Sequence, residues 1–450
     1  MSAITRVLAR WGALPSADLF ARLADEFGTE RSIQRALKAE PDVLAMGKTT
    51  RRTYALRRPE IAPVSIMLRR EDGSDRAVAT LTGLAAGQWR VAPEPAAPTW
   101  ITLGQREETP GIFQGLPWYL EPFRPAGFVG RAWVREHAAA HGWTVDVNAW
   151  SEDQVIQAAL EQPWDTRGNL GLARIAVAAD AAVPAAQRQH LYAERAGKVL
   201  NGEMVGASAD GEQPKFTAVV DDGQERPLRP VLVKFSPYLT DDPAAQRWGD
   251  IMVTEAVAAQ VMTLNGMSAA STMVWRYDDR IWLETTRFDR IGTCGRRGMA
   301  SLRALAQTFG YTGPQNGWVT AVEHLQRRGA VGDEQVEHAR HLAAIGHLLA
   351  NTDMHMGNLS FLLSDDAEPL LSIAPAYDMA PMRWVPGATS GRAPALESEA
   401  IPNTDDREAL VVAREIWEET ARHPLVTQAW AAWSNDRARQ LKERLERSEN

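Results

Sequence analysis

Two aspartates and an asparagine in the C-terminal third of the chain have a spacing that could serve phosphoryl transfer. Asp353 and Asn358 stand five residues apart in segment 351–358, and Asp378 follows 20 residues after Asn358. Transfer of a phosphoryl group from ATP needs a carboxylate that orients the attacking hydroxyl and oxygen ligands for magnesium. In protein kinases the catalytic aspartate and the magnesium-binding asparagine keep the same interval. Because the interval also arises by chance, the interpretation depends on its context.

A lysine in a short apolar segment, Lys234 in 231–235, is the first part of that context. A buried ammonium needs an anion nearby, and the α- and β-phosphates of ATP would supply one. The alternative is an edge strand whose lysine points to solvent and protects the sheet edge. The residue type leaves both alternatives open.

A loop of small residues, 206–216, precedes this lysine and leads into a strand. Glycines let backbone amides approach phosphates closely, so the loop is a candidate cover for a nucleotide. It matches neither G-x-x-x-x-G-K-[ST] nor G-x-G-x-x-G. By itself it predicts only a turn.

These residues need a β-rich part and a helical part to bring them together. Alternating patterns predict short strands between residues 61 and 103 and further strands at 216–220, 231–235 and 281–288. Helical periodicity predicts helices at 132–140, 152–161, 185–200 and 250–264, and a mainly helical chain after residue 301. The predicted fold class is α+β, with the bilobal order of protein-kinase-like folds.

The first 60 residues predict a small domain of a different kind. Three amphipathic helices, at 4–11, 16–23 and 30–37, precede two strands around a basic turn within 43–58, and Thr29 is the expected N-cap of the third helix. This order is typical of a winged helix-turn-helix domain. The candidate DNA-binding residues lie on the third helix and the basic turn: Arg31, Gln34, Arg35, Lys38, Lys48, Arg51 and Arg52.

The charge distribution agrees with a nucleic-acid contact at this end. Residues 1–58 carry 11 Lys or Arg against 6 Asp or Glu, a net charge of +5, whereas the whole chain carries -8. A basic segment on an acidic protein attracts phosphates locally. The alternative is a solvated helical cap that contacts proteins.

Length and composition indicate a folded protein of more than one domain. With 450 residues, of which 45% are hydrophobic, we expect three parts, at 1–60, 61–285 and 286–450. The single cysteine, Cys294, cannot form an intramolecular disulfide, which favours the reducing cytoplasm. No run of about 18 apolar residues and no secretory apolar core occurs, so no membrane span is expected.

Taken together and in order, these motifs resemble those of HipA-type serine/threonine kinases, which are toxins of bacterial toxin–antitoxin systems. Segment 115–128 also looks like the N-terminal subdomain of that family, so the resemblance spans roughly residues 60–450. The N-terminal extension is similar to the branch that carries a winged helix ahead of the kinase. The segments that carry the resemblance are Ser208 to Lys215, Lys234, Arg287 to Arg290, 351–358 and Tyr377-Asp378.

The resemblance implies a role for each matching residue. Asp353 would be the proton acceptor, Asn358 and Asp378 would bind magnesium, and Ser208 would be an autophosphorylation site. The implied ATP contacts are the covering loop Asp210, Gly211, Glu212, Gln213, Pro214 and Lys215, the phosphate-binding Lys234, the hinge Thr286, Arg287 and Phe288, and the flanking His355 and Tyr377.

Two positions stand apart from this pattern. Glu255, on the predicted helix 250–264, could pair with Lys234 as in protein kinases, but a solvated helix glutamate is the interpretation that the sequence favours. Thr286 stands where many members of the family have glutamate. Since hinge contacts to adenine are usually made by backbone atoms, we expect ATP binding to survive this difference.

The expected function is an ATP- and Mg-dependent serine/threonine kinase that phosphorylates a bacterial protein and inhibits growth, with a fused DNA-binding domain for autoregulation. One alternative is a DNA-binding transcriptional regulator whose kinase fold senses nucleotide with little or no activity. Another is a metal-dependent nuclease that uses Asp353, His355 and Asp378. A separate antitoxin and a homodimer are further expectations, and the sequence does not identify the protein substrate.

Overall fold

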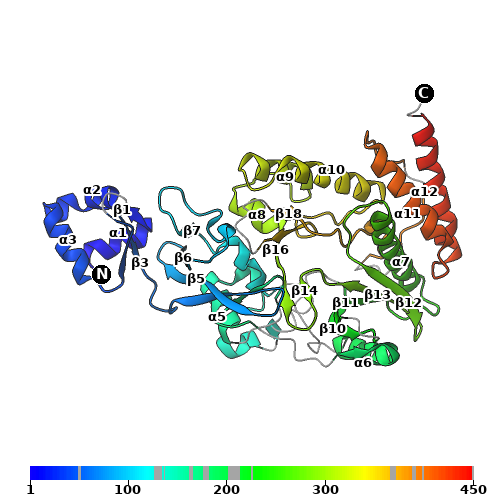
Figure 1. Ribbon diagram of the computed structural model, residues 1–450, viewed down its shortest axis with the longest axis horizontal. Coiled ribbons are helices and arrows are strands. Elements are labelled where there is room, and N and C mark those ends of the chain that lie inside the picture. Colours follow the sequence, from blue (N-terminus) through cyan, green and yellow to red (C-terminus); the bar gives the residue numbers. More distant parts are fainter. Residues whose placement is uncertain are drawn as a thin grey trace.

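The computed structural model describes residues 1–48, 52–125, 134–135, 137–161, 166–175, 182–200, 213–223, 227–364, 371–387, 392–397 and 400–447. In Figure 1 the N-terminal helices lie at one end of the molecule and the C-terminal helices at the other. The described residues form five β-sheets: two sheets of five strands, two of three strands and one of two strands.

The N-terminal domain has the element order that the sequence predicts. Ser2 and Thr29 cap the first and third helices, because each hydroxyl accepts a backbone N–H of the first turn. Apolar side chains from all three helices form a common core over a sheet of order β1-β3-β2. The elements are α1 (Ala3–Trp11), β1 (Leu14–Pro15), α2 (Ser16–Phe27), α3 (Glu30–Ala39), β2 (Val43–Met46) and β3 (Thr53–Leu56). Its assignment as a winged helix stays a prediction.

This domain is joined to the next one by buried contacts. The side chain of Gln88, which is 1% exposed, accepts the N–H of Ala13 at 2.7 Å. The guanidinium of Arg58 lies 4.6 Å from the ring centre of Trp89. A small apolar cluster, made of Ala13, Ala55, Leu84 and Ile112, closes the junction.

The middle domain is a five-stranded antiparallel sheet of order β7-β6-β5-β4-β8. Its aromatic side chains, among them Trp100, Trp118 and Tyr119, pack at its core with ring centres 5.2 to 6.1 Å apart. The elements are β4 (Val64–Arg69), β5 (Asp75–Leu84), β6 (Gln88–Pro93), η2 (Thr99–Thr102), β7 (Ile112–Gln114), η3 (Trp118–Phe123), η4 (Ala138–His141), η5 (Val147–Ala149), α5 (Glu152–Glu161) and β8 (Leu170–Leu172).

A second five-stranded sheet, of order β12-β13-β11-β10-β9, carries Lys234. Because side chains alternate along a strand, Val231, Val233 and Phe235 face helix α6 while Lys234 faces the opposite side. Its elements are β9 (Val183–Pro184), η6 (Ala185–Gln187), α6 (Arg188–Leu200), β10 (Lys215–Asp221), β11 (Arg229–Phe235), α7 (Pro243–Leu264), β12 (Thr272–Tyr277) and β13 (Arg280–Thr286).

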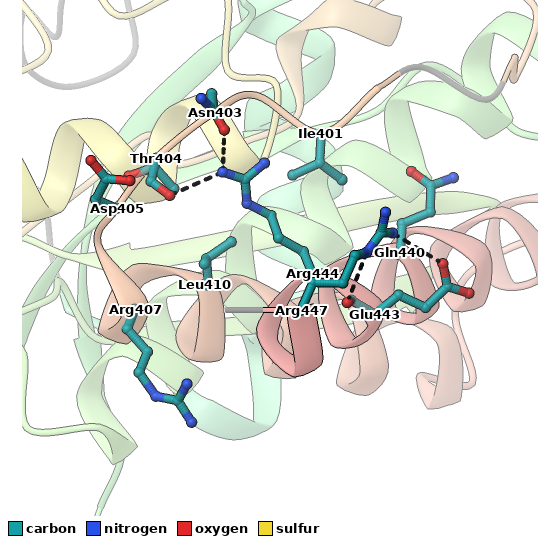
Figure 2. Close-up of a pocket in the computed structure, with 10 residues that line it drawn as sticks. All are labelled: Ile401, Asn403, Thr404, Asp405, Arg407, Leu410, Gln440, Glu443, Arg444 and Arg447. Atoms are coloured by element: carbon teal, nitrogen blue, oxygen red, sulfur yellow. Dashed lines mark hydrogen bonds and ion pairs between the residues drawn. The ribbon is translucent and has the colours of Figure 1, made fainter. Parts of the chain in front are cut away.

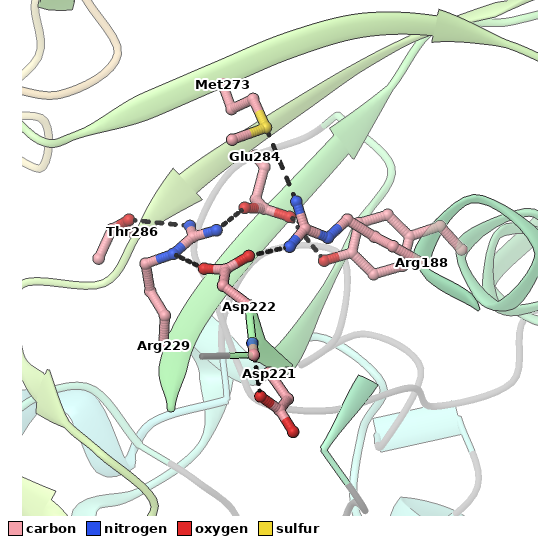
Figure 3. A network of polar contacts seen from close by, with 9 residues as sticks. Arg188, Asp221, Asp222, Arg229, Met273, Glu284 and Thr286 are labelled. Carbon is pink, nitrogen blue, oxygen red and sulfur yellow. Dashed lines mark hydrogen bonds and ion pairs between the residues drawn. The ribbon is translucent and has the colours of Figure 1, made fainter. Parts of the chain in front are cut away.

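A charge-balanced network lies on the α6 side of this sheet (Figure 3). Arg229 donates from Nε to Asp222 at 3.0 Å and forms an ion pair with the fully buried Glu284 at 2.6 Å. Arg188, the first residue of α6, also binds Asp222. Tyr192 donates to Glu284 at 2.8 Å, and burial together with that carboxylate raises the pKa of the phenol. These contacts fix α6 to the sheet.

The C-terminal lobe is mainly helical, as predicted, with one three-stranded sheet of order β16-β17-β18. Four tryptophans, Trp384, Trp417, Trp430 and Trp433, form a cluster between its last helices. The elements are β14 (Arg290–Ile291), β15 (Gly295–Arg296), β16 (Gly298–Ser301), α8 (Leu302–Thr308), α9 (Trp318–Arg327), α10 (Asp333–Leu348), β17 (Ser360–Leu363), β18 (Ser372–Ile373), η7 (Met382–Trp384), α11 (Arg407–Arg422) and α12 (Gln428–Arg447).

Candidate active site

A cavity of about 650 Å³ lies where the middle domain, the Lys234 sheet and the helical lobe meet. Its polar lining contains carboxylates, lysines and an asparagine from segments far apart in the sequence. A smaller cavity of about 120 Å³ adjoins it and shares Lys215, Asn358 and Asp378. The predicted residues that line the larger cavity are Gln213, Lys215, Lys234, Asp353, His355, Asn358 and Asp378.

Lys234 sits between two carboxylates at the wall of this cavity. Its Nζ is 2.7 Å from Oε1 of Glu255 and 2.5 Å from Oδ1 of Asp378. Strand β11 lies inside the sheet, between β13 and β10, so the edge-strand alternative is wrong. The expectation of a solvated Glu255 is also wrong, because its side chain is 8% exposed and paired with Lys234. Helical periodicity in the sequence predicts the helix that carries Glu255, but it does not show that this helix packs against the strand of Lys234.

Burial and ion pairing act in opposite directions on these three groups. Burial alone would raise the pKa of Asp378, but the ammonium of Lys234 and the nearby Lys215 lower it to about 2. Burial likewise opposes the charge of Lys234, and the two carboxylates outweigh it and raise its pKa. The pKa of Glu255 is raised by burial, against the pull of Lys234. Of the two carboxyl groups, Asp378 is the one whose pKa is lowered by the neighbouring lysines.

Asp353 is held at the cavity by the residues that flank it in its own loop. Asn358 donates from Nδ2 to the carbonyl oxygen of Asp353 at 2.8 Å, and the Asp353 carboxylate lies 3.4 Å from the same nitrogen. Asn351 accepts the N–H of Asp353 at 3.0 Å and donates to the carbonyl of Asp378 at 3.1 Å. Hydrogen bonds within the 351–358 loop, and one from the loop to Asp378, therefore hold Asp353 in place.

His355 lies beside the Asp353 carboxylate. Its Nε2 is 3.7 Å from Oδ1 of Asp353, and its Nδ1 accepts the N–H of Gly357 at 3.0 Å. Because a backbone N–H only donates, a neutral ring carries its hydrogen on Nε2, towards Asp353. Arg303 lies 3.2 Å from Nδ1 and also lines the cavity. Arg303 had no motif around it, and only the fold reveals its position.

The smaller cavity has an aromatic wall. The rings of Phe288 and Tyr377 are 5.8 Å apart, and the hydroxyl of Tyr377 donates to the carbonyl of Gly357 at 2.9 Å. Thr286, Arg287 and Phe288 all line this cavity. The amide groups of Thr286 and Arg287 donate to Ser271 and Pro230 at 2.8 and 2.9 Å. The backbone N–H groups of both hinge residues are therefore already hydrogen-bonded to other backbone carbonyls of the protein.

The predicted nucleotide-covering loop is only partly described. Ser208, Asp210, Gly211 and Glu212 lie outside the described residues, as does Arg51 of the basic turn. Pro214 directly precedes β10, and Lys215 is 3% exposed and lies opposite Lys234 in the sheet register. The cavity therefore has a second buried lysine, which could meet an anionic ligand.

The donor set suits a magnesium ion. Magnesium prefers oxygen ligands and commonly takes one or two carboxylates together with phosphate oxygens. Asp378 supplies an ionised carboxylate at the cavity, and Asn358 supplies an amide oxygen while its nitrogen binds Asp353. Within the described ranges, no group of three or more His, Cys, Asp or Glu side chains is arranged so that it could hold a metal ion.

A larger cavity, of about 700 Å³, lies between the start of α11 and the end of α12 (Figure 2). None of the predicted site residues lines it. Arg444 binds Asn403 and donates to the carbonyl of Thr404 at 3.1 Å, and Arg447 donates to the carbonyl of Glu443 at 3.2 Å. These arginines support local structure, so the cavity at Lys234 is the candidate active site.

The predicted DNA-binding residues share one face of α3. Ile33 and Leu37 are buried in the domain core, while Arg31, Gln34, Arg35 and Lys38 are exposed. Their spacing, i, i+3, i+4 and i+7, places them on one side of a helix. Lys48 and Arg52 are exposed at the ends of β2 and β3, and the other face of this hairpin packs on the middle domain through Leu44 and Met46.

Two family models match the chain: "HipA-like C-terminal domain" at residues 207–447 and "YjjJ-like toxin, middle domain" at residues 61–179. The chain therefore belongs to the HipA-like family of toxins, with a kinase-like fold. More particularly, it belongs with the YjjJ-like toxins. It is 32% identical to Toxin YjjJ of Escherichia coli (strain K12) over 464 residues, which cover 99% of each chain.

Solved structures agree at the level of the fold. The chain matches HipA in the Shewanella oneidensis MR-1 HipA, HipB and operator DNA complex with a TM-score of 0.51 and 14% identity, over 85% of this chain and 97% of that chain. A search of the described residues for a helix long and apolar enough to span a membrane finds none.

Proposed function

We propose that the protein is an ATP- and Mg-dependent serine/threonine kinase whose phosphorylation of a bacterial protein inhibits growth. The observation that carries the proposal is the buried Lys234–Glu255 pair, which faces the same cavity as Asp353, Asn358 and Asp378. A lysine paired with a helix glutamate, a catalytic aspartate and two metal-binding residues are the parts that kinases use. Membership of the HipA-like toxins supports the same reading.

In this proposal Asp353 is the catalytic residue. Its carboxylate accepts a hydrogen bond from the serine or threonine hydroxyl of the substrate and orients it for attack on the γ-phosphorus. His355 and Asn358, which lie 3.7 and 3.4 Å from its two oxygens, limit the directions in which the carboxylate can turn. The hydroxyl proton is then lost towards Asp353 as the new phosphorus–oxygen bond forms and the bond to ADP breaks.

Lys234, Lys215, Asn358 and Asp378 would hold the phosphate end of the nucleotide. The two lysines neutralise phosphate oxygens, and Asn358 and Asp378 would hold magnesium. When bound, magnesium supplies positive charge that offsets the charge developing on the phosphate oxygens. The adenine would enter the smaller cavity, with Phe288 and Tyr377 at its wall. Gln213 and Pro214 would belong to the cover over the nucleotide, together with Asp210, Gly211 and Glu212.

The N-terminal domain supports a second activity, binding to DNA. The exposed row Arg31, Gln34, Arg35 and Lys38 on α3 presents cations and an amide on one helix face, as a recognition helix does. Lys48 and Arg52 would contact phosphates. A solved structure that this chain resembles in fold is the complex of HipA with HipB and operator DNA. We propose accordingly that the kinase can be brought to its own operator, with an antitoxin as a further partner.

One observation favours a second candidate, a DNA-binding regulator that senses nucleotide with little activity. Asp378 binds Lys234 directly, in the place where a phosphate would be expected. If this contact persisted with nucleotide bound, the phosphates would be held poorly and transfer would be slow. The two candidates differ in turnover and agree in nucleotide binding.

A phosphate-transfer assay with labelled ATP distinguishes the kinase from the regulator. The full-length protein is incubated with γ-labelled ATP, magnesium and a bacterial lysate. An Asp353→Asn variant that folds like the wild type is treated in the same way. The kinase proposal expects labelled protein bands with the wild type and a loss of at least about a hundredfold in the variant. Equal labelling, or no labelling by a wild type that binds ATP, would contradict the proposal and favour the regulator.

A further inference from the structure

Helix α7, which carries Glu255, is buried on nearly all sides. The buried positions run almost without interruption from Gly249 to Met262, the pattern of a helix enclosed by protein. One side packs on strands β12 and β13, and the other on helix α11, as Figure 1 shows. The helix therefore belongs to the cores of both lobes.

Polar contacts of two buried residues on α7 tie this helix to the start of α12. The carboxylate of Asp250, which is 3% exposed, accepts the N–H of Thr427 at 2.7 Å and its hydroxyl at 2.8 Å. Four residues further along α7, the hydroxyl of Thr254 accepts the indole N–H of Trp430 at 3.0 Å. Asp250, Thr254 and Trp430 are buried and Thr427 is partly buried, so breaking either contact leaves a buried polar group unsatisfied.

These contacts and Glu255 lie on different sides of the same helix. Asp250 and Thr254 are four residues apart and share a face, whereas Glu255 is one residue beyond Thr254, about 100° further around the axis. Rotation of α7 about its axis would therefore move Glu255 away from Lys234. The contacts with Thr427 and Trp430 resist such a rotation.

The same helix α12 also supports the chain that follows Asp378. Trp384, in η7, lies with its ring centre 4.2 Å from that of Trp433 and 6.3 Å from that of Trp430. Helix α12 thus supports both carboxylates at Lys234. It supports Glu255 through its contacts with α7, and Asp378 through its contacts with η7.

We propose that Asp250 and Thr254 are positioning residues, through which α12 holds Glu255 against Lys234 and makes the nucleotide site permanently assembled. This inference rests on the proposed nucleotide site at Lys234. Control of the protein would then have to act elsewhere than on the placement of α7. The residues act through Glu255 and do not themselves contact the nucleotide.

The test measures affinity for a fluorescent ATP analogue with magnesium, using full-length protein. Asp250→Ala removes both acceptors, Thr427→Val removes one donor, and Asp250→Asn keeps two contacts because the Thr427 hydroxyl can accept instead of donate. Arg439→Ala, at an exposed position of α12, is the matched control. We expect about tenfold weaker binding for Asp250→Ala, less for Thr427→Val, and wild-type affinity for Asp250→Asn and the control.

A double-mutant cycle with Glu255→Gln separates positioning from general loosening. If Asp250 acts through Glu255, Asp250→Ala weakens binding no further once Glu255→Gln is present. Additive effects, or unchanged affinity in folded Asp250→Ala and Thr427→Val, would overturn the inference. A wild type that does not bind the analogue would instead contradict the proposed function, so the two failures are distinguishable.

Discussion

Lys234 and Asp378, 144 residues apart in the sequence, meet with Nζ and Oδ1 at 2.5 Å. The contact joins β11, the central strand of the five-stranded sheet that carries Lys234, to the segment that follows the 351–358 loop. With Glu255 on its other side, the ammonium is matched by two carboxylates. A phosphate that binds Lys234 must therefore share it with Asp378, and a cation on Asp378 would ease that exchange.

Replacement of Lys234 by Met should disable the site. The change leaves Glu255 and Asp378 facing one another without the ammonium that binds both, and breaking a buried pair in this way costs about 3–5 kcal/mol. We expect ATP affinity to fall by at least about a hundredfold and the melting temperature to fall as well. Lys198→Met, at a half-exposed position of α6, removes the same charge and should change neither. Normal affinity in a folded Lys234→Met protein would exclude this lysine as a phosphate contact.

Asp378→Asn should separate magnesium binding from folding. Asp378 has φ +55°, a left-handed conformation that Asn tolerates better than most residues. We expect a folded protein in which magnesium no longer strengthens ATP binding, measured by titration with and without the metal. Asp378→Ala should lose stability in addition. If magnesium strengthened binding equally in wild type and Asp378→Asn, the metal would have other ligands.

Asp250 predicts a pH dependence of stability. Burial raises the pKa of Asp250 from 3.8 to about 6, although the hydrogen bonds from Thr427 act against this shift. A raised pKa means that the folded protein favours the protonated carboxyl, so ionisation costs stability as pH rises through 6, by up to about 3 kcal/mol. The cost is relieved as pH falls from 6 towards 4.

The control is Asp250→Asn, which has no such ionisation. Its melting temperature should exceed that of the wild type at pH 7.5, and the difference should shrink on going to pH 4.5. Parallel melting curves across this range would show that Asp250 does not titrate there.

The basic face of α3 predicts salt-dependent DNA binding. Arg31→Ala combined with Arg35→Ala should weaken binding to the operator region and reduce the slope of log affinity against log salt by about 2, one for each lost phosphate contact. Arg422→Ala combined with Lys442→Ala removes two charges from the distant C-terminal helices and serves as control. If both pairs lowered affinity equally, α3 would not be the reading helix.

Local patterns in the sequence were sufficient to predict much of the fold. The three N-terminal helices, the strand around Lys234 and the helix at 152–161 have clear periodicity and agree with α1–α3, β11 and α5. Thr29 also caps α3 as expected. These features depend on neighbours within a few residues, so a single sequence carries them.

Features that depend on long-range packing were not predictable. Glu255 was expected in solvent, because a helix of mixed composition does not show which strand covers it. The roles of Arg303 and of Asp250 depend on segments 52 and 177 residues away. Nothing in the neighbouring sequence of either residue predicts these distant contacts, which become visible only in the folded structure.

The central claim, that Asp353 directs phosphoryl transfer to a protein hydroxyl, is tested most directly by mapping phosphosites. Bacteria expressing the wild type or Asp353→Asn at equal protein levels are compared by quantitative phosphoproteomics and by growth. We predict serine or threonine phosphosites that occur only with the wild type, accompanied by growth arrest only in those cells. Equal growth arrest with identical phosphosites in both would contradict the account.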